Sequence, residues 1–400
     1  MDGMLRACRA LVHARLARLT RGSLTFVDQM GSARFGEPAP PADLCAEIRV
    51  HDLRAYRALV FGGSVAGGEA YVRGEWSADD LVAALRVVAA NPDMGSGLDR
   101  GVSRLGALLH KVRHRLRRNS KRGSRANIHA HYDQGNELFA TFLDPTLSYS
   151  CSVFPRPQAS LEEAAVHKLD LVCGKLGLRP GQSLLEIGTG WGGLALHAAG
   201  RYGCSVTTTT ISGEQARLAR ARVAAAGLSD RVEVLEADYR DLPRMNRQFD
   251  RLVSVEMIEA VGAKYLGTFF DVCGRLLRPD GKALIQAIVI ADQAWERYRR
   301  SADFIQRHVF PGGCLPSITA LCDAAAARSP LRLLDLEDFT PHYAATLAHW
   351  RKRLHAAVDR GDARQLSADA LRSFDYYFAY CEAGFRERLS GLVQMVFRAA

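Results

Sequence analysis

Residues 184–193 read Leu-Leu-Glu-Ile-Gly-Thr-Gly-Trp-Gly-Gly, and this stretch decides the fold. The first four residues predict a buried strand, the glycines a tight turn, and the residues from Leu194 a helix. Glycines let the backbone approach a ligand closely at the carboxyl end of a strand, where open α/β sheets bind cofactors. The dinucleotide spacing GxGxxG and the phosphate-binding ending Gly-Lys-Ser/Thr are both absent. The stretch therefore predicts a cofactor turn of another kind.

Strand and helix alternate from about residue 125 onward, which is typical of an α/β, doubly wound parallel sheet. The expected strands are residues 183–187, 205–210, 232–236, 251–255, 283–289 and 331–336. The clearest expected helices are 213–226 and 264–277, the second stopped by Pro-Asp-Gly at 279–281.

The N-terminal part predicts a smaller α+β module. Apolar residues at helical spacing over 4–19, interrupted by arginines, indicate a basic amphipathic helix, which either packs on its own domain or lies on a membrane surface. Short strands are expected at 48–50 and 71–73, with the Gly-Gly pairs at 62–63 and 67–68 as turns. We expect an N-terminal basic lipid-binding domain with its linker over 1–122 and a catalytic domain over 123–400.

Charge points to an anionic partner. The 53 Lys and Arg against 43 Asp and Glu give a net charge of +10, and residues 100–125 hold ten of these basic residues and no acid. A solvated linker, phospholipid headgroups and RNA all remain compatible with that segment. The nine cysteines form no CxxC pair, and no apolar run is long enough to cross a bilayer, so we expect reduced thiols in the cytosol.

The pattern ExGxGxG after an apolar strand resembles the motif of class I S-adenosylmethionine (SAM) methyltransferases. In that reading Glu186 orients the cofactor ammonium, and amides around Gly188 and Gly190 face its carboxylate. The second strand ends without the acid that usually holds the ribose, so Thr210 and Gln215 are the substitutes. The candidate cofactor-binding residues are Tyr149, Ser150, Glu186, Gly188, Gly190, Gly192, Thr210, Ile211, Gln215, Asp238 and Tyr239.

Several ordered motifs resemble the cyclopropane fatty acid synthase family, over roughly residues 125–400. The quoted segments are HYDQGNELF at 131–139, LDP at 143–145, YSC at 149–151, TIS at 210–212, DYRDL at 238–242, SVEMIEAVG at 254–262 and PHY at 341–343. The segments 68–71 and 74–76 resemble the small N-terminal domain of that family. The resemblance implies transfer of the SAM methyl carbon to the double bond of an unsaturated acyl chain in a membrane phospholipid, forming a cyclopropane fatty acid.

The resemblance also implies a catalytic set. In the family the base is a bound bicarbonate ion held by four side chains. By this resemblance Cys151, Glu259 and Tyr343 match three of the four. Gln286 stands where the family usually has histidine; it can hold an anion but cannot relay a proton. The segment 255–262 together with Gln286 resembles a branch that forms methylene-branched chains, so a methyl- or methylene-branched product is the alternative. Cys381 is a weaker catalytic candidate, because such a cysteine is more often buried packing.

The expected partners are an anionic phospholipid surface and an unsaturated acyl chain, with no nucleic acid, no metal and a possible homodimer. The expected location is the cytoplasm, peripherally on the inner face of the membrane. Two other functions stay open: an RNA or small-molecule methyltransferase with the same core, and a catalytically inactive protein that binds lipid or SAM.

Overall fold

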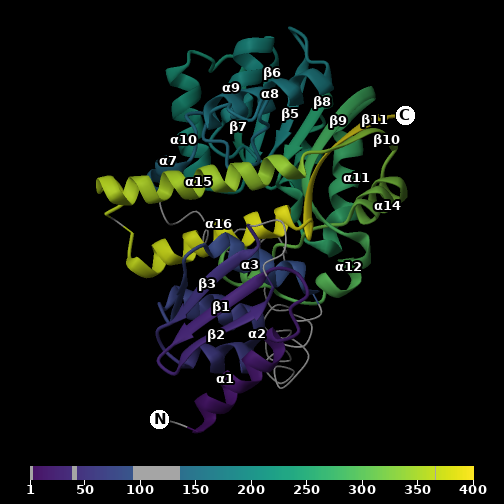
Figure 1. Cartoon of the computed structure of the whole chain (residues 1–400). Coiled ribbons are helices and arrows are strands. Elements are labelled where there is room, and N and C mark those ends of the chain that lie inside the picture. The colour runs from purple at the N-terminus through teal and green to yellow at the C-terminus, as the bar shows by residue number, and fades with distance from the viewer. Residues whose placement is uncertain (1–2, 38–42, 93–135, 365) are drawn as a thin grey trace. The chain divides into compact units, whose positions relative to one another are not determined.

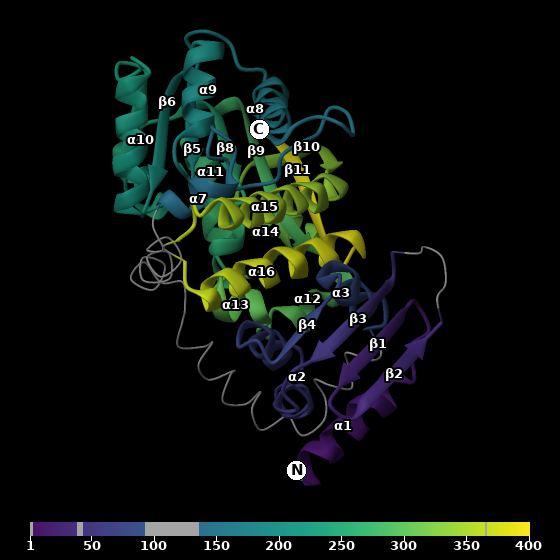
Figure 2. The same cartoon turned by 60° about the vertical axis from the view of Figure 1, so that its left-hand side comes forward.

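The computed structural model describes residues 3–37, 43–92, 136–364 and 366–400. They form two compact units (Figures 1 and 2). The first contains the described residues up to 92 together with Ser301–Val309 and Trp350–Leu389; the second contains those from 136 to Arg300 together with Phe310–His349 and Ser390–Ala400. The expected domain boundary at 122 and the basic stretch 100–125 lie outside the described residues.

The first unit is built on a four-stranded sheet in the order β2-β1-β3-β4. Its strands are β1 (Ser23–Asp28), β2 (Gly31–Gly36), β3 (Cys45–Val50) and β4 (Trp76–Ala78), and its helices are α1 (Gly3–Leu16), α2 (Arg54–Val72), α3 (Leu81–Ala90), α13 (Phe304–His308) and α16 (Ala368–Arg386). Cys8, Val12 and Leu16 of α1 are buried in the core of this unit. The N-terminal helix therefore packs on its own domain, as the first of its two interpretations expected.

The expected strand at 71–73 is wrong, because Tyr71 and Val72 end α2 and Arg73 caps it. The Gly-Gly pairs at 62–63 and 67–68 also lie inside α2 and do not end it as turns would. Gly63 has a φ of 64°, which kinks the helix without ending it. A Cβ on Gly68 would lie 2.7 Å from the ring of Tyr376 on α16. The glycines thus serve close helix packing, a use that a sequence pattern does not separate from a turn.

The second unit contains a seven-stranded sheet in the order β10-β11-β9-β8-β5-β6-β7. Its strands are β5 (Ser183–Ile187), β6 (Ser205–Thr210), β7 (Val232–Glu236), β8 (Phe249–Val255), β9 (Leu277–Ile290), β10 (Leu331–Asp338) and β11 (Ser390–Ala399). The five strands β5 to β9 pair in parallel, whereas β11 is antiparallel to β9 and β10. All six expected strands are confirmed, three of them longer than expected, and β11 was missed.

Helices cover both faces of this sheet (Figure 2). The helices of this unit are α7 (Asn136–Phe142), α8 (Leu161–Leu176), α9 (Gly193–Tyr202), α10 (Gly213–Ala225), α11 (Leu266–Leu276), α12 (Asp292–Tyr298), α14 (Ile318–Arg328) and α15 (Thr340–Arg360), the last continuing into the first unit. Leu184 packs in a core with α8, α9 and α10, and Leu185 in another with α11 and α14. Adjacent strand residues point to opposite faces, so an unbroken apolar strand suits a sheet covered on both sides.

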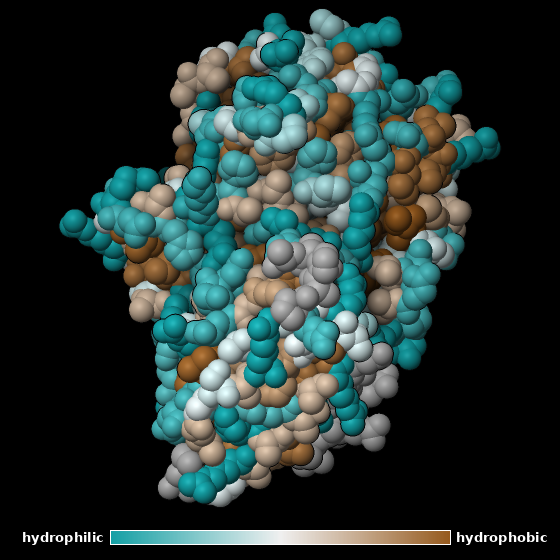
Figure 3. All heavy atoms as spheres, in the orientation of Figure 1, coloured by the Kyte–Doolittle hydropathy of each residue, from teal (hydrophilic) through white to brown (hydrophobic). Residues whose placement is uncertain are grey.

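Two surface features complete the fold. Among the described residues, no helix is long and apolar enough to cross a membrane. The edge strand β10 exposes Leu333, Leu334 and Leu336, and Figure 3 shows apolar side chains on that side of the unit.

Candidate active site

The glycine turn lies at the carboxyl end of β5, in the centre of the parallel strands. Gly188, Gly190 and Gly192 have φ values of 105°, 52° and 84°, a region that favours glycine. A Cβ on Gly193 would lie 2.5 Å from the carbonyl oxygen of Thr146, so the loop after α7 lies directly on the turn. Arg222 of α10 joins the two, donating to the carbonyl oxygens of Thr146 and Trp191 at 3.1 and 2.6 Å.

Glu186 is buried at this turn. Its Oε2 lies 2.6 Å from the hydroxyl of Thr208, which is also 2.7 Å from the hydroxyl of Thr189. Burial raises the pKa of Glu186 to about 8. A buried carboxyl group with so few partners suits a cationic ligand group, because the ammonium end of an amino acid would stabilise its charged form.

The other expected cofactor residues lie around the same turn, and they differ in how far their polar groups are already hydrogen-bonded within the protein. Thr210 donates to Gln215 at 2.8 Å, Ile211 lies between them in the chain, and Ser212 caps α10. Asp238 is buried and salt-bridged to Arg240, and the Tyr239 ring packs edge-on against Phe269. The Gly188 amide donates to the Thr209 carbonyl at 3.0 Å, so it is already engaged within the sheet. The turn and its carboxylate fit SAM, whereas Asp238 is turned toward an internal arginine.

A second carboxylate lies next to this turn. A Cβ on Gly188 would be 3.2 Å from the Cβ of Met257, so the turn contacts the segment that follows β8. Glu256, the first residue after that strand, has a φ of 49°. A left-handed conformation costs a residue with a side chain about 1–2 kcal/mol. Strain of this kind persists where the surroundings hold the residue in place.

Three donors hold the Glu256 carboxylate. The Cys151 amide and the Gln286 side-chain amide donate to Oε1 at 2.8 and 2.7 Å, and the Tyr343 hydroxyl donates to Oε2 at 2.6 Å. Gln394 of β11 in turn donates to Gln286 at 2.9 Å. Burial raises the pKa of Glu256, and these hydrogen bonds work against that rise. The structure thus brings together three of the four best catalytic candidates, around a residue that sequence reasoning missed.

Glu259, the carboxylate expected at this centre, lies beside it. Its Oε1 accepts from the Ile288 amide of β9 at 2.5 Å, and its Oε2 is buried without a partner among the residues that the structure describes. Burial, together with the nearby charge of Glu256, raises the pKa of Glu259 to about 8. Two neighbouring carboxyl groups with raised pKa values are typical of sites that move a proton.

Cys151 contacts Glu256 through its backbone and not through its sulfur. The thiol is buried and donates to the carbonyl oxygen of Ser152 at 3.1 Å. Burial and the charge of Glu256 raise the pKa of this thiol well above its ordinary value, so it stays protonated. Cys381 lies on α16 in the first unit, where burial also raises its pKa, and its role stays a prediction.

Lys168 is a further residue that sequence reasoning missed. It lies on the buried face of α8, 2% exposed, and donates to Ser150 at 2.9 Å. Burial lowers its pKa, while the charges of Glu256, Asp144 and Glu186 act to raise it. The available signal was a lysine in line with Leu169, Val172 and Leu176 on an apolar helix face. Ser150 joins it to the cofactor loop, where the Tyr149 ring packs near Trp191.

The parallel strands of the second unit carry a glycine turn after the first of them, a buried carboxylate at that turn and an adjacent acid-base cluster. Together these features define a class I SAM-dependent methyltransferase. The family model of mycolic acid cyclopropane synthetase matches residues 119–395. The chain belongs to this family and is a SAM-dependent methyltransferase.

Relatives match most of the chain. Tuberculostearic acid methyltransferase UfaA1 of Mycobacterium tuberculosis is 40% identical over 394 residues, 96% of this chain and 90% of its own length. Cyclopropane-fatty-acyl-phospholipid synthase of Escherichia coli is 36% identical over 355 residues, 88% of this chain and 87% of its own. Among solved structures, M. tuberculosis cyclopropane synthase MmaA2 matches with a TM-score of 0.63 and 30% identity, over 68% of this chain and 98% of that one. Mycolic acid cyclopropane synthase CmaA1, solved with SAH and CTAB, matches at 0.61 and 32%, with the same coverage.

Proposed function

We propose that this enzyme transfers a methyl carbon from SAM to the double bond of an unsaturated acyl chain in a membrane phospholipid, and that Glu256 is the base that removes the resulting proton. The observation that carries the proposal is the Glu256 carboxylate, held by Cys151, Gln286 and Tyr343 next to the cofactor turn.

An alkene is a weak nucleophile, so the reaction leaves a positive charge on the acyl chain that a base must relieve. Bound SAM supplies an electrophilic methyl group. A carbon–carbon bond forms as the methyl–sulfur bond breaks, and a proton then passes to Glu256. If the added methyl group loses the proton directly, the electron pair of its C–H bond closes a cyclopropane ring. If a hydride first shifts from the methylated carbon to the neighbouring cationic carbon, the same electron pair forms a methylene double bond. A carboxylate with a raised pKa suits this step, because a base works best when its pKa is near the working pH.

A bicarbonate ion does not fit the residues that the family resemblance assigns to it. The Cys151 amide, the Gln286 amide and the Tyr343 hydroxyl are already bonded to Glu256, and the charge of that carboxylate opposes a second anion in the same place. The proposed base is therefore part of the protein. Glu259 and Lys168 influence the protonation of Glu256 and do not take part in bond formation.

The proposed product is a methylene-branched acyl chain. The relative that covers 96% of this chain is named for tuberculostearic acid, a methyl-branched fatty acid, which supports a branched product. A saturated methyl branch would need a reductant for the methylene double bond, and no reductant is part of the proposed reaction. A cyclopropane is the second candidate, because the family description and the E. coli relative are named for that product.

The test uses the whole enzyme, methyl-labelled SAM and vesicles of an anionic phospholipid with monounsaturated chains. The proposal expects label in the acyl chains, and none with vesicles whose chains are saturated. Both products add CH2 and have the same mass, so proton NMR of the released fatty acids separates vinylic from cyclopropane protons. Label that enters only RNA or a small molecule contradicts the lipid substrate, and SAM binding without turnover supports an inactive binding protein.

A further inference from the structure

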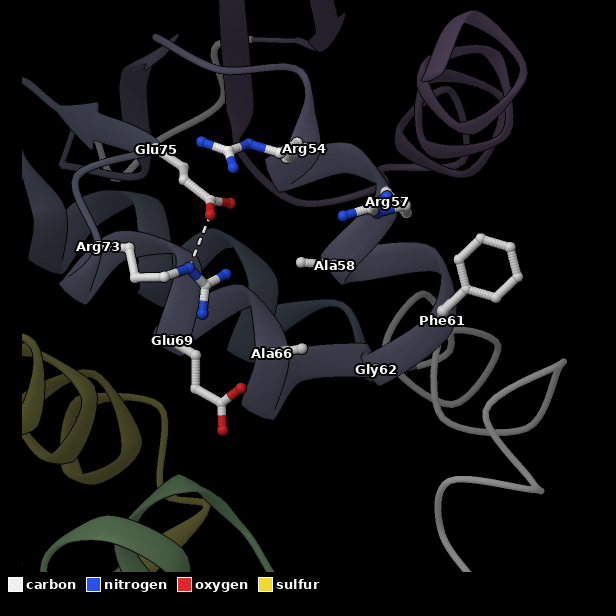
Figure 4. A pocket seen from close by; sticks show the side chains of 9 residues that line it. All are labelled: Arg54, Arg57, Ala58, Phe61, Gly62, Ala66, Glu69, Arg73 and Glu75. Carbon is white, nitrogen blue, oxygen red and sulfur yellow. Dashed lines mark hydrogen bonds and ion pairs between the residues drawn. The ribbon is translucent and has the colours of Figure 1, made fainter. Parts of the chain in front are cut away.

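We infer that the first unit carries a recognition site for the phosphoethanolamine headgroup of a phospholipid, in a hollow on α2. This inference rests on the proposed phospholipid substrate and adds the headgroup that is preferred. The hollow has a volume of about 450 Å³, within the range of small-molecule sites. Figure 4 shows its lining, which is Arg54, Arg57, Ala58, Phe61, Gly62, Ala66, Glu69, Arg73 and Glu75.

The spacing along α2 produces the hollow. Ala58 and Gly62 are four residues apart and share one face of the helix before the kink at Gly63. Ala66 follows the kink, and a Cβ on Gly62 would lie 2.3 Å from its Cβ. Their small side chains leave room between charged residues at either end.

Arg57 gives the hollow a cation that is free to bind an anion. Its side chain is exposed, and no hydrogen bond or ion pair joins it to the part of the chain that the structure describes. Arg54 and Arg73, which line the same hollow, already pair with Asp52 and Glu75 at 2.7 and 2.6 Å. Phosphate is the ligand that arginine recognises best, through paired N–H donors.

Glu75 supplies the second half of the recognition. This residue is 7% exposed, and its Oε1 accepts from Arg73, while no residue in the described ranges hydrogen-bonds to its buried Oε2. Figure 4 shows the carboxylate directed into the hollow. A buried unpaired carboxylate oxygen is costly, and a ligand that donates a hydrogen bond removes that cost.

A phosphoethanolamine group matches both halves, since its phosphate is an anion for Arg57 and its primary ammonium donates hydrogen bonds to Glu75. A trimethylammonium group, as in phosphocholine, has no N–H to donate, and phosphoglycerol has no cation. Phe61 is 43% exposed at the edge of the hollow, where it can contact the apolar part of a lipid. The chemistry therefore favours ethanolamine over choline and glycerol headgroups.

The test measures binding, without SAM and without turnover, so that it is separate from the test of the reaction. Glycerophosphoethanolamine and glycerophosphocholine are titrated into the full chain by calorimetry. We expect the ethanolamine compound to bind about tenfold more tightly, since a charge-assisted hydrogen bond distinguishes them. Glu75→Gln should remove that preference, and Arg57→Ala should weaken both compounds by about tenfold. Arg364→Ala, which removes an exposed arginine outside the hollow, should change neither.

Equal binding of the two compounds, or an Arg57→Ala variant that binds like Arg364→Ala, overturns the inference even if the enzyme methylates lipids. Arg57 is exposed, so its variant keeps the test valid if Glu75→Gln fails to fold.

Vesicles identify the source of the ligand. Tighter sedimentation with phosphatidylethanolamine than with phosphatidylcholine supports the lipid headgroup, and no difference indicates a free phosphoethanolamine and overturns the lipid assignment.

Discussion

Glu256 and Gln286 are bonded to each other twice: the Glu256 amide donates to the Gln286 carbonyl at 2.8 Å, and the Gln286 side chain donates to the Glu256 carboxylate at 2.7 Å. The backbone bond fixes the end of β8 against β9, and the side-chain bond aims the carboxylate. Glutamine at 286 is therefore suited to hold a carboxylate rather than to relay a proton.

Replacing Glu256 by glutamine should stop proton removal while keeping the shape of the site. We expect the turnover number to fall by about 10²–10⁴-fold, the usual contribution of a general base. SAM affinity should stay within about twofold, since Glu256 is not a cofactor residue in this account. Asp271→Asn, at an exposed site on α11, is the matched control. A variant with ordinary turnover would show that Glu256 is not the base.

Replacing Glu186 by glutamine should weaken SAM binding. The loss of one charge-assisted contact to an ammonium group predicts a dissociation constant about 10–100-fold higher, by calorimetry or equilibrium dialysis. The turnover number at saturating SAM should change much less. An unchanged dissociation constant would remove Glu186 from the cofactor site.

Cys151→Ala should keep most of the activity, because the contact with Glu256 is made by the backbone amide, which alanine retains. We expect turnover within about tenfold of the parent enzyme, the loss coming from the small cavity left by the sulfur. The buried protonated thiol should also resist alkylation in the folded protein, as mass spectrometry of an iodoacetamide-treated sample can show. Rapid alkylation of Cys151 with loss of activity would indicate a thiolate role instead.

The raised pKa of Glu259 predicts how stability depends on pH. With a pKa of about 8 in the folded protein against an ordinary 4.5, the folded state holds this proton over a range where the unfolded state has lost it. The contribution of Glu259 to the free energy of unfolding should therefore fall as pH rises from about 4.5 to 8. Urea unfolding at several pH values should show that the free energy of unfolding falls less steeply with rising pH in Glu259→Gln than in the parent enzyme. Identical slopes in the two proteins would contradict the raised pKa.

The sequence predicted the sheet well, because covered parallel strands are apolar runs of standard length. The motifs also singled out Cys151, Gln286 and Tyr343, which the structure places around Glu256. Their common acceptor was missed, because Glu256 and Glu259 are three residues apart in one motif. The sequence does not tell which of these two buried carboxylates accepts the three hydrogen bonds. The missed strand β11 places Gln394 against Gln286, a contact across 108 residues that no local pattern contains. Lys168 was missed because it lies among apolar residues of α8, outside every motif quoted from the sequence.

The central claim is that the protein carries its own anion where an external one would sit, and a rescue measurement tests it most directly. Turnover is followed in buffers depleted of carbon dioxide and then supplemented with bicarbonate, for the parent enzyme and for Glu256→Gly. Glycine accepts the left-handed backbone at this position and leaves the three donors free. Bicarbonate should have no effect on the parent enzyme and should restore part of the activity of the variant. A parent enzyme that loses its activity on depletion and regains it with bicarbonate would contradict the account.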